Sequence, residues 1–153
     1  MNEPSDNLAR VCYFFHKNNV KFVIVGARAC ALHGHIRATQ DIDVLIQNAR
    51  ENIEKAILTI REMYPHLKED LTAEDFYSNV IVKILDEPEI DVSLSAWSVT
   101  FDSAQGDIET IVLEDVAIPY LGISSLIKSK DTKREQDLWD IRVLREIQKN
   151  KEK

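Results

Sequence analysis

The sequence predicts an α+β fold in which a mixed sheet of about four to five strands is flanked by helices. An apolar run of strand length occupies residues 22–25, and a second predicted strand at residues 41–47 carries two carboxylates. Residues 50–64 instead carry apolar side chains at the 3.6-residue period of an amphipathic helix. Two further apolar segments, 79–85 and 90–94, are separated by a short polar turn, which indicates an antiparallel hairpin.

The remaining elements follow from the same patterns. An Asn-Asn pair, a Gly and Pro65 end the first three helices. A helical turn is expected near residues 72–76, a short strand or hairpin over 108–119, and irregular structure over 96–107. The predicted helices span residues 6–18, 27–32, 50–64, 124–129 and 135–149.

Length and composition place the chain among ordinary globular proteins. It has 153 residues, of which 44% are hydrophobic and 29% charged, and these values predict a single domain, 1–153, with residues 124–149 packed on it as C-terminal helices. The net charge of −7 argues against general nucleic-acid binding, which needs clustered Lys and Arg. The sequence shows no membrane-length apolar run and no signal peptide, so we expect no membrane partner and a cytoplasmic location.

Two carboxylates stand out on the second predicted strand. Asp41 and Asp43 are two residues apart, so their side chains point to the same face of the sheet. The polar face ends at once, because Leu45 follows them on that face. Strands rarely carry adjacent acids, and the pair predicts either a cation site or an exposed edge facing water.

A glycine turn and a third acid accompany this pair. Gly26 directly follows the strand at residues 22–25 and begins a helix, whose free N–H groups suit phosphate. Asp91 lies between Ile and Val at the start of a hairpin arm, and Glu89 on the same face is a lesser candidate. Two or three carboxylates together with substrate phosphates are sufficient to bind Mg²⁺.

These residues resemble a known family. An apolar strand, a Gly, a short helix and then Asp-x-Asp on the next strand are similar to the nucleotidyltransferase fold of the DNA polymerase beta superfamily. The segment from Val25-Gly26 to Asp41-Ile42-Asp43 most resembles the minimal single-domain bacterial members, including those related to AbiE-type toxins. The superfamily's usual Gly-Gly or Gly-Ser pair is Gly26-Ala27 in this chain.

The resemblance implies a role for each acid. Asp41 and Asp43 would hold a metal, Mg²⁺ or Mn²⁺, that also binds the triphosphate of an NTP. Asp91 would complete a second metal site and help to deprotonate an acceptor hydroxyl. That hydroxyl, on a protein, an RNA or a small molecule, would attack the α-phosphate and release pyrophosphate.

The resemblance also implies a set of nucleotide-binding residues. Gly26 and Ala27 would contact the phosphates, and Arg37 and Thr39 immediately precede the acids. An alternative for Arg37 is a salt bridge to Asp41 or Asp43. The C-terminal run resembles the family through the following charged residues: Lys128, Lys130, Arg134, Asp137 and Asp140.

Within that run, Lys130 and Arg134 would bind nucleotide phosphate or an acceptor backbone, and a solvated helix face is the alternative. His33 and His35 flank Gly34 and lack nearby Cys or acidic partners for zinc, so we expect local loop hydrogen bonds. Trp97 and Trp139 are expected in the core.

Two functions compete at this point. The first is a Mg²⁺-dependent nucleotidyltransferase that moves a nucleoside monophosphate from an NTP to a hydroxyl. The second is a weakly active or inactive nucleotidyltransferase-like binding or regulatory module, one half of a toxin–antitoxin pair with a small protein partner. A metal-dependent phosphoesterase is disfavoured because the sequence lacks His-rich metal ligands.

Overall fold

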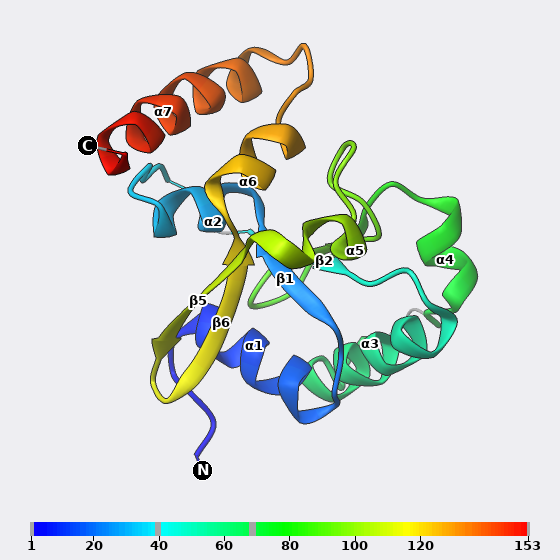
Figure 1. The fold of residues 1–153 in the computed structure, drawn as a ribbon. Coiled ribbons are helices and arrows are strands. Elements are labelled where there is room, and N and C mark those ends of the chain that lie inside the picture. Colours follow the sequence, from blue (N-terminus) through cyan, green and yellow to red (C-terminus); the bar gives the residue numbers. More distant parts are fainter. Residues whose placement is uncertain (1, 39–40, 68–69, 153) are drawn as a thin grey trace.

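A computed structural model of the protein describes residues 2–38, 41–67 and 70–152. Within these residues, six strands form one mixed sheet in the order β3-β4-β2-β1-β6-β5 (Figure 1). The α+β class is confirmed, and the sheet has slightly more strands than predicted. The strands are β1 Phe22–Val25, β2 Ile42–Ile46, β3 Val82–Ile84, β4 Ile90–Ser93, β5 Ile108–Leu113 and β6 Val116–Leu121.

The sheet places β2 between two partners of opposite direction. It runs antiparallel to β1 and parallel to β4. The hairpins β3–β4 and β5–β6 form the two edges, and β6 runs parallel to β1. Both faces of β1 are buried, as its continuous apolar run predicts.

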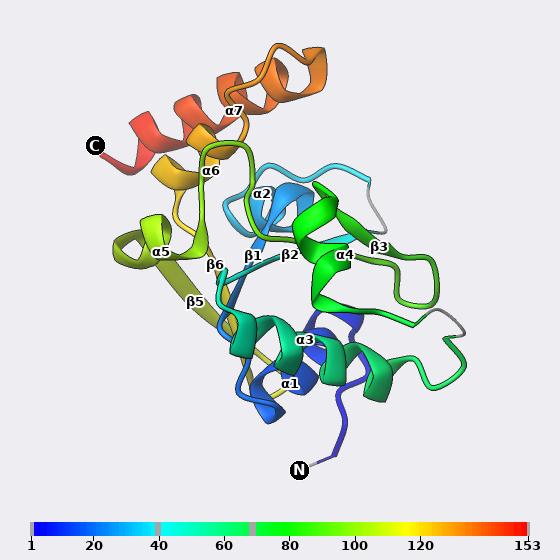
Figure 2. The same ribbon diagram turned by 90° about the vertical axis from the view of Figure 1, so that its right-hand side faces the viewer.

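Helices cover the sheet from two sides. Helices α1 and α3 lie side by side below the sheet in Figure 2, whereas α2, α6 and α7 gather at the opposite end of the molecule (Figures 1 and 2). The helices are α1 Asn7–Lys17, α2 Gly26–Leu32, α3 Arg50–Met63, α4 Ala73–Ser78, α5 Phe101–Ala104, α6 Ile123–Ser129 and α7 Glu135–Lys151, with a 3₁₀ turn at Gln105–Asp107.

Two expectations about this outer layer are wrong. Residues 101–107 are helical rather than irregular, because the side chain of Thr100 accepts a hydrogen bond from the Ser103 N–H and caps a short helix. Both tryptophans are exposed rather than buried in the core: Trp97 is 63% and Trp139 52% exposed. The helical period places Trp139 on the side of α7 opposite its buried residues, which are Asp137, Asp140, Ile141 and Leu144.

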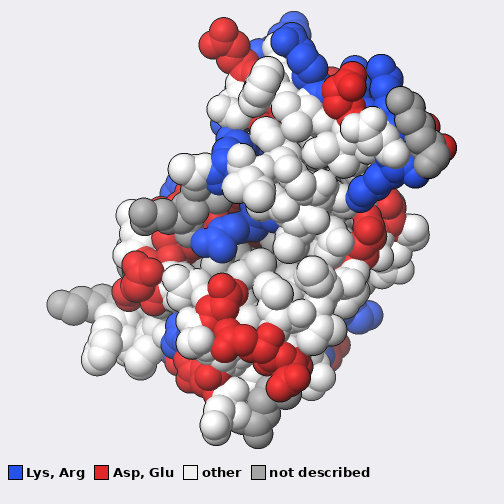
Figure 3. Space-filling view, turned by 90° about the vertical axis from the view of Figure 1, so that its left-hand side faces the viewer, with Lys and Arg blue, Asp and Glu red and all other residues white. Residues whose placement is uncertain are grey.

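Charge is unevenly distributed over the surface. On the face shown in Figure 3, most Lys and Arg side chains lie in the upper half, where α7 is found, and an acidic group occupies the lower half. Cys12 and Cys30 are buried and form no disulfide, as expected. No helix among the described residues is long and apolar enough to cross a membrane.

Candidate active site

Two of the three predicted acids, Asp43 and Asp91, lie next to each other through strand pairing. Asp43 on β2 lies opposite Asp91 on β4 in parallel register, so both side chains leave the same face of the sheet. The two carboxyl groups are close enough to share a hydrogen bond. The structure thus brings together two acids that are far apart in the sequence.

Gly26 packs directly against Asp43 of this acid pair. Its φ of +67° is a conformation that L-residues rarely adopt. A Cβ atom placed there would lie 1.9 Å from Asp43 Oδ2, so any side chain at this position would displace the carboxylate. The glycine between β1 and α2 is therefore required both by its backbone and by the acid packed against it.

The environment of Asp43 disfavours its charged form. Burial is the main cause, and the neighbouring carboxylates of Asp91 and Asp41 add to it, so the pKa of Asp43 rises to about 6. The nearby ammonium of Lys130 acts in the opposite direction but is outweighed. Asp43 is therefore an acid that a cation would help to ionise.

Asp41 lies just before β2, at the margin of this pair. It contributes to the raised pKa of Asp43 and shares a hydrogen bond with Glu89. Partial burial and the Asp41 carboxylate both raise the pKa of Glu89. Four acidic side chains, Asp41, Asp43, Glu89 and Asp91, therefore influence one another at this end of β2 and β4.

Lys83 is a site residue that the sequence analysis missed. Its ammonium lies 3.1 Å and 3.2 Å from the two oxygens of Asp91. The hairpin places it there, because Lys83 on β3 pairs with Asp91 on β4. The hydrogen bond to Asp91 raises the pKa of Lys83. The predicted strands 79–85 and 90–94 would place Ile84 opposite Asp91, and the observed register differs from this by one residue.

The acids open into a cavity of about 260 Å³. Its floor includes Asp43, Asp91 and Gly26, and the chain segment 129–137 forms a second wall. Apolar side chains line the rest, together with small polar ones. The lining also includes Val80, Ile81, Ser93, Ser95, Trp97, Lys130, Thr132, Arg134 and Asp137.

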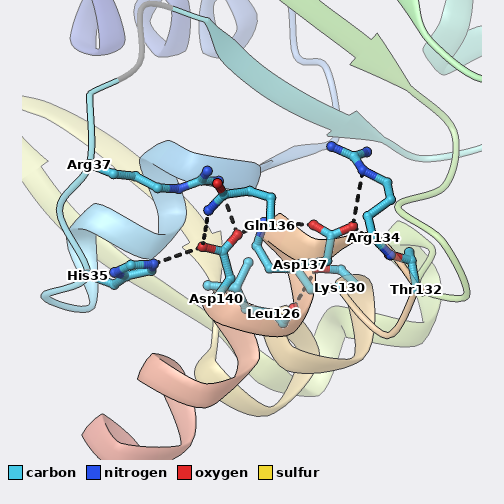
Figure 4. A network of polar contacts seen from close by, with 10 residues as sticks. His35, Arg37, Leu126, Lys130, Thr132, Arg134, Gln136, Asp137 and Asp140 are labelled. Carbon is cyan, nitrogen blue, oxygen red and sulfur yellow. Dashed lines mark hydrogen bonds and ion pairs between the residues drawn. The ribbon is translucent and has the colours of Figure 1, made fainter.

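Apart from these acids, Asp140 on α7 contacts several basic side chains (Figure 4). Its Oδ2 lies 2.9 Å from Lys130 Nζ and 3.1 Å from Arg37 Nη2, and its Oδ1 lies 2.8 Å from His35 Nε2. Gln136 Nε2 donates a further hydrogen bond at 3.1 Å. Burial raises the pKa of Asp140, but the hydrogen bonds and charges of these partners outweigh it and lower the pKa overall.

Some predicted nucleotide-binding residues belong to this Asp140 network instead. Lys130 is 7% exposed, so it does not lie on a solvated helix face, although it does line the cavity. Arg37 pairs with Asp140 rather than with Asp41 or Asp43. The contacts of His35 and His33 are also long-range rather than local, since His33 Nε2 lies 2.7 Å from the Leu121 carbonyl oxygen.

The other predicted residues divide as follows. Arg134 lines the cavity and is largely exposed, with its Nε 3.6 Å from Asp137 Oδ2. Thr132 Oγ1 donates to the same carboxylate at 2.6 Å. Ala27 is buried and is not among the residues that line the cavity. Thr39 lies outside the described residues.

The carboxylates of the site are suitable ligands for a divalent cation that also binds substrate phosphates. Within the described part of the chain, no three His, Cys, Asp or Glu side chains are arranged as a ready-made metal cage. Mg²⁺ needs fewer protein ligands, because it retains waters and takes oxygens from substrate phosphates. The carboxyl groups of Asp43 and Asp91, which come from paired strands and line the same cavity, fit such a two-carboxylate site.

The chain was then compared with known families. A family model described as a nucleotidyltransferase of unknown function, DUF6036, matches residues 6–142. The chain belongs to this family. The matched range contains both acids of the site, the glycine turn and the Asp140 network. No curated protein matches the chain.

Solved structures show the same fold in distant proteins. An antigenic nucleotidyltransferase-like protein from Paracoccidioides brasiliensis is 17% identical, with a TM-score of 0.58 over 92% of this chain and 76% of its own. A Thermotoga maritima protein described as a nucleotidyltransferase is 15% identical, with a TM-score of 0.58 over 93% of this chain and 88% of its own. The nucleotidyltransferase-like fold predicted from the sequence is confirmed.

Proposed function

We propose that this DUF6036 protein is a Mg²⁺-dependent nucleotidyltransferase that moves a nucleoside monophosphate from an NTP to a hydroxyl acceptor. The observation that carries the proposal is the contact between Asp43 and Asp91, formed against Gly26 at the floor of a cavity. Acids with raised pKa values in a cavity are typical of functional sites. Family membership and fold agree with this chemistry without identifying the substrates.

Asp43 and Asp91 would hold the metal, with Asp41 beside them, and Mn²⁺ would fit the same oxygen ligands. When bound, the ion would neutralise charge on the triphosphate and on the leaving pyrophosphate. The absence of a side chain at Gly26 lets a phosphate approach the backbone closely. Lys130 lines the same cavity and would add positive charge near the phosphates.

In the reaction, the acceptor oxygen would form a bond to the α-phosphorus while the bond from that phosphorus to pyrophosphate breaks. Asp91 would accept the proton of the acceptor hydroxyl. It is placed for this role because it lines the cavity beside Asp43. The chain's contribution is then orientation and fixed charge rather than a covalent intermediate.

Transfer of label from α-labelled NTPs tests the proposal, with Mg²⁺ or Mn²⁺ and with the protein itself, an RNA pool or a small-molecule extract as acceptor. We expect Asp43→Asn and Asp91→Asn to lower transfer by about a hundredfold or more. Glu135→Gln, an exposed acid on α7, removes the same charge and should retain activity. Equal labelling by the wild type and by an Asp41→Ala/Asp43→Ala protein would reject the proposal.

One observation favours a second candidate, a nucleotide-binding regulatory module with little or no transfer. Lys83 already supplies Asp91 with a cation, and no complete metal cage is present among the described residues. This version includes the toxin–antitoxin role, with a small protein partner, that the AbiE-like motifs suggest. It predicts NTP binding without transfer to any acceptor, and stable co-purification with a protein encoded by a neighbouring gene.

A further inference from the structure

Trp97 lies where the active-site cavity meets a second hollow. Its side chain lines the cavity that holds Asp43 and Asp91. It also lines the adjoining hollow, whose other walls are residues 131–134. An indole ring that is 63% exposed gains little from the hydrophobic effect. Its position between the two hollows therefore needs an explanation other than packing.

The backbone holds this ring on a tight turn. Ala96 and Val99 exchange two backbone hydrogen bonds of 2.8 Å and 3.0 Å, which leaves Trp97 and Ser98 at the tip. Trp97 has a φ of +56°, a region that a bulky residue rarely adopts. Val99 is buried and anchors the turn in the core. Such strain at an exposed residue points to a functional role for the side chain.

The cavity has the two chemical characters of a nucleotide. Its acids and Lys130 suit a metal-bound triphosphate, whereas Val80, Ile81 and Trp97 line it with apolar surface. A nucleobase is the flat, apolar part of an NTP, and it stacks well on an indole face. Arg134, whose guanidinium can also stack on a base, lines both hollows next to Trp97.

We propose that Trp97 is the stacking platform for the nucleobase of the bound NTP. The inference rests on the proposed function, because it assumes that the triphosphate lies at Asp43 and Asp91. It goes further by assigning the opposite end of the ligand to one side chain. Stacking tolerates any base, so the platform would contribute affinity for all four NTPs.

Calorimetric titration can separate the two ends of the ligand. Each NTP and inorganic tripolyphosphate, which has no base, is titrated with Mg²⁺ into the wild type and three variants. Trp97→Ala should weaken NTP binding between about fivefold and about a hundredfold and leave tripolyphosphate binding unchanged. Trp97→Phe keeps a ring and should retain most of the affinity. Trp139→Ala, the other exposed tryptophan, should bind like the wild type.

Fluorescence supplies an independent readout. The chain has two tryptophans, so Trp139→Phe leaves Trp97 as the only one. We expect NTPs to quench this emission and tripolyphosphate to leave it unchanged. In Trp97→Phe, the remaining Trp139 should not respond to either ligand. Trp97 is exposed, so these variants should fold, and their circular dichroism spectra check this.

The outcomes distinguish the two proposals. Equal NTP affinity of the wild type and Trp97→Ala, or NTP binding no tighter than that of tripolyphosphate, overturns the stacking role and leaves the phosphate site in place. Quenching by an oligonucleotide but not by NTPs assigns the ring to the acceptor and also overturns it. A wild type that binds neither NTP nor tripolyphosphate refutes the proposed function, and the stacking role with it.

Discussion

Asp43 and Asp140 are carboxylates withdrawn from water in two regions of one protein, and their pKa values move in opposite directions. Asp140 is fully buried, yet Lys130, Arg37 and His35 compensate its charge and lower its pKa. Asp43 lies among other acids, and its pKa rises to about 6. Burial is the main cause of the raised pKa of Asp43, whereas at Asp140 the hydrogen bonds and cations within reach outweigh burial.

The comparison shows where a ligand is needed. The Asp140 network joins α7, the end of α6 and the segment that follows α2, and it pairs its carboxylate with Lys130 and Arg37 of the same chain. The acid pair at Asp43 and Asp91 has an excess of negative charge that a cation from outside would relieve. Lys130 connects the two regions, since it contacts Asp140 and also lowers the pKa of Asp43. The Asp140 network thus holds the Lys130 ammonium close to Asp43.

Removing Asp140 should produce the largest effect. Asp140→Ala leaves Lys130 and Arg37 without their shared carboxylate, and breaking a buried ion pair in this way costs about 3 to 5 kcal/mol of unfolding free energy. Urea denaturation at pH 7 measures the loss. Glu146→Ala removes an exposed acid from the same helix and should change stability by less than about 0.5 kcal/mol. A similar small change for both variants would contradict the compensated network.

Removing the charge of Asp43 should act in the opposite sense. Its pKa is 3.8 in the unfolded chain and about 6 in the fold, so the unfolded state binds fewer protons between these values. The unfolding free energy of the wild type therefore falls as pH rises from about 4 to about 6. Asp43→Asn removes this loss and should be about 3 kcal/mol more stable at pH 8, with no advantage below pH 4.

Denaturation of both proteins across this pH range, with Glu135→Gln as the control for net charge, checks the prediction. An Asn variant that is less stable than the wild type at pH 8 would show that Asp43 stabilises the fold, and the contrast with Asp140 would not hold.

Divalent cations should stabilise the wild type, because they relieve the excess negative charge around Asp43. The expected change in unfolding free energy is smaller than for the two substitutions above. Mg²⁺ at about ten times its dissociation constant should stabilise the wild type by about 1 kcal/mol at pH 8. Asp43→Asn and Asp91→Asn should respond much less, because each lacks one of the two carboxylates. Thermal denaturation with MgCl₂, against KCl of equal ionic strength, measures the shift. Equal stabilisation of all three proteins would place the cation elsewhere.

Lys83→Met should have the smallest effect on stability. Its ammonium is half exposed in the pair with Asp91, and such pairs contribute about 0.5 kcal/mol. The variant should nevertheless bind Mg²⁺ more tightly, because a competing cation is gone. Calorimetric titration measures this, with Lys21→Met, an exposed lysine at the far end of β1, as the matched control. Weaker Mg²⁺ binding would mean that Lys83 supports the site rather than competing for it.

Local patterns allowed most of the fold to be predicted. The buried strand at residues 22–25, the helix that ends before Pro65 and the hairpin at Asp91 depend on neighbouring residues. The exposure of Trp97 was not predictable in this way, because it depends on a two-residue turn within a segment without periodicity. The sixth strand was also missed, since the 108–119 segment could be read as one short strand or as a hairpin.

The candidate site likewise contains residues that local patterns predict and residues that only long-range packing places. Asp43 and Asp91 were predictable because strand alternation specifies the face of the sheet on which each side chain lies. Gly26 was predictable because a glycine directly after a buried strand indicates a tight turn. Lys130 and Arg37 were assigned to phosphate, whereas the structure pairs both with Asp140. That pairing depends on how α7 packs against segments far away in the sequence, and no local pattern reports it. The roles of these residues toward a nucleotide stay predictions.

The parallel register of β2 and β4 also determines which changes in chain length the protein can tolerate during evolution. Residues inserted between the two strands lengthen a connection and leave Asp43 opposite Asp91. A deletion of one residue within either strand would turn its carboxylate to the other side of the sheet. Natural variants should therefore differ in length between residues 47 and 89 and keep both strands intact.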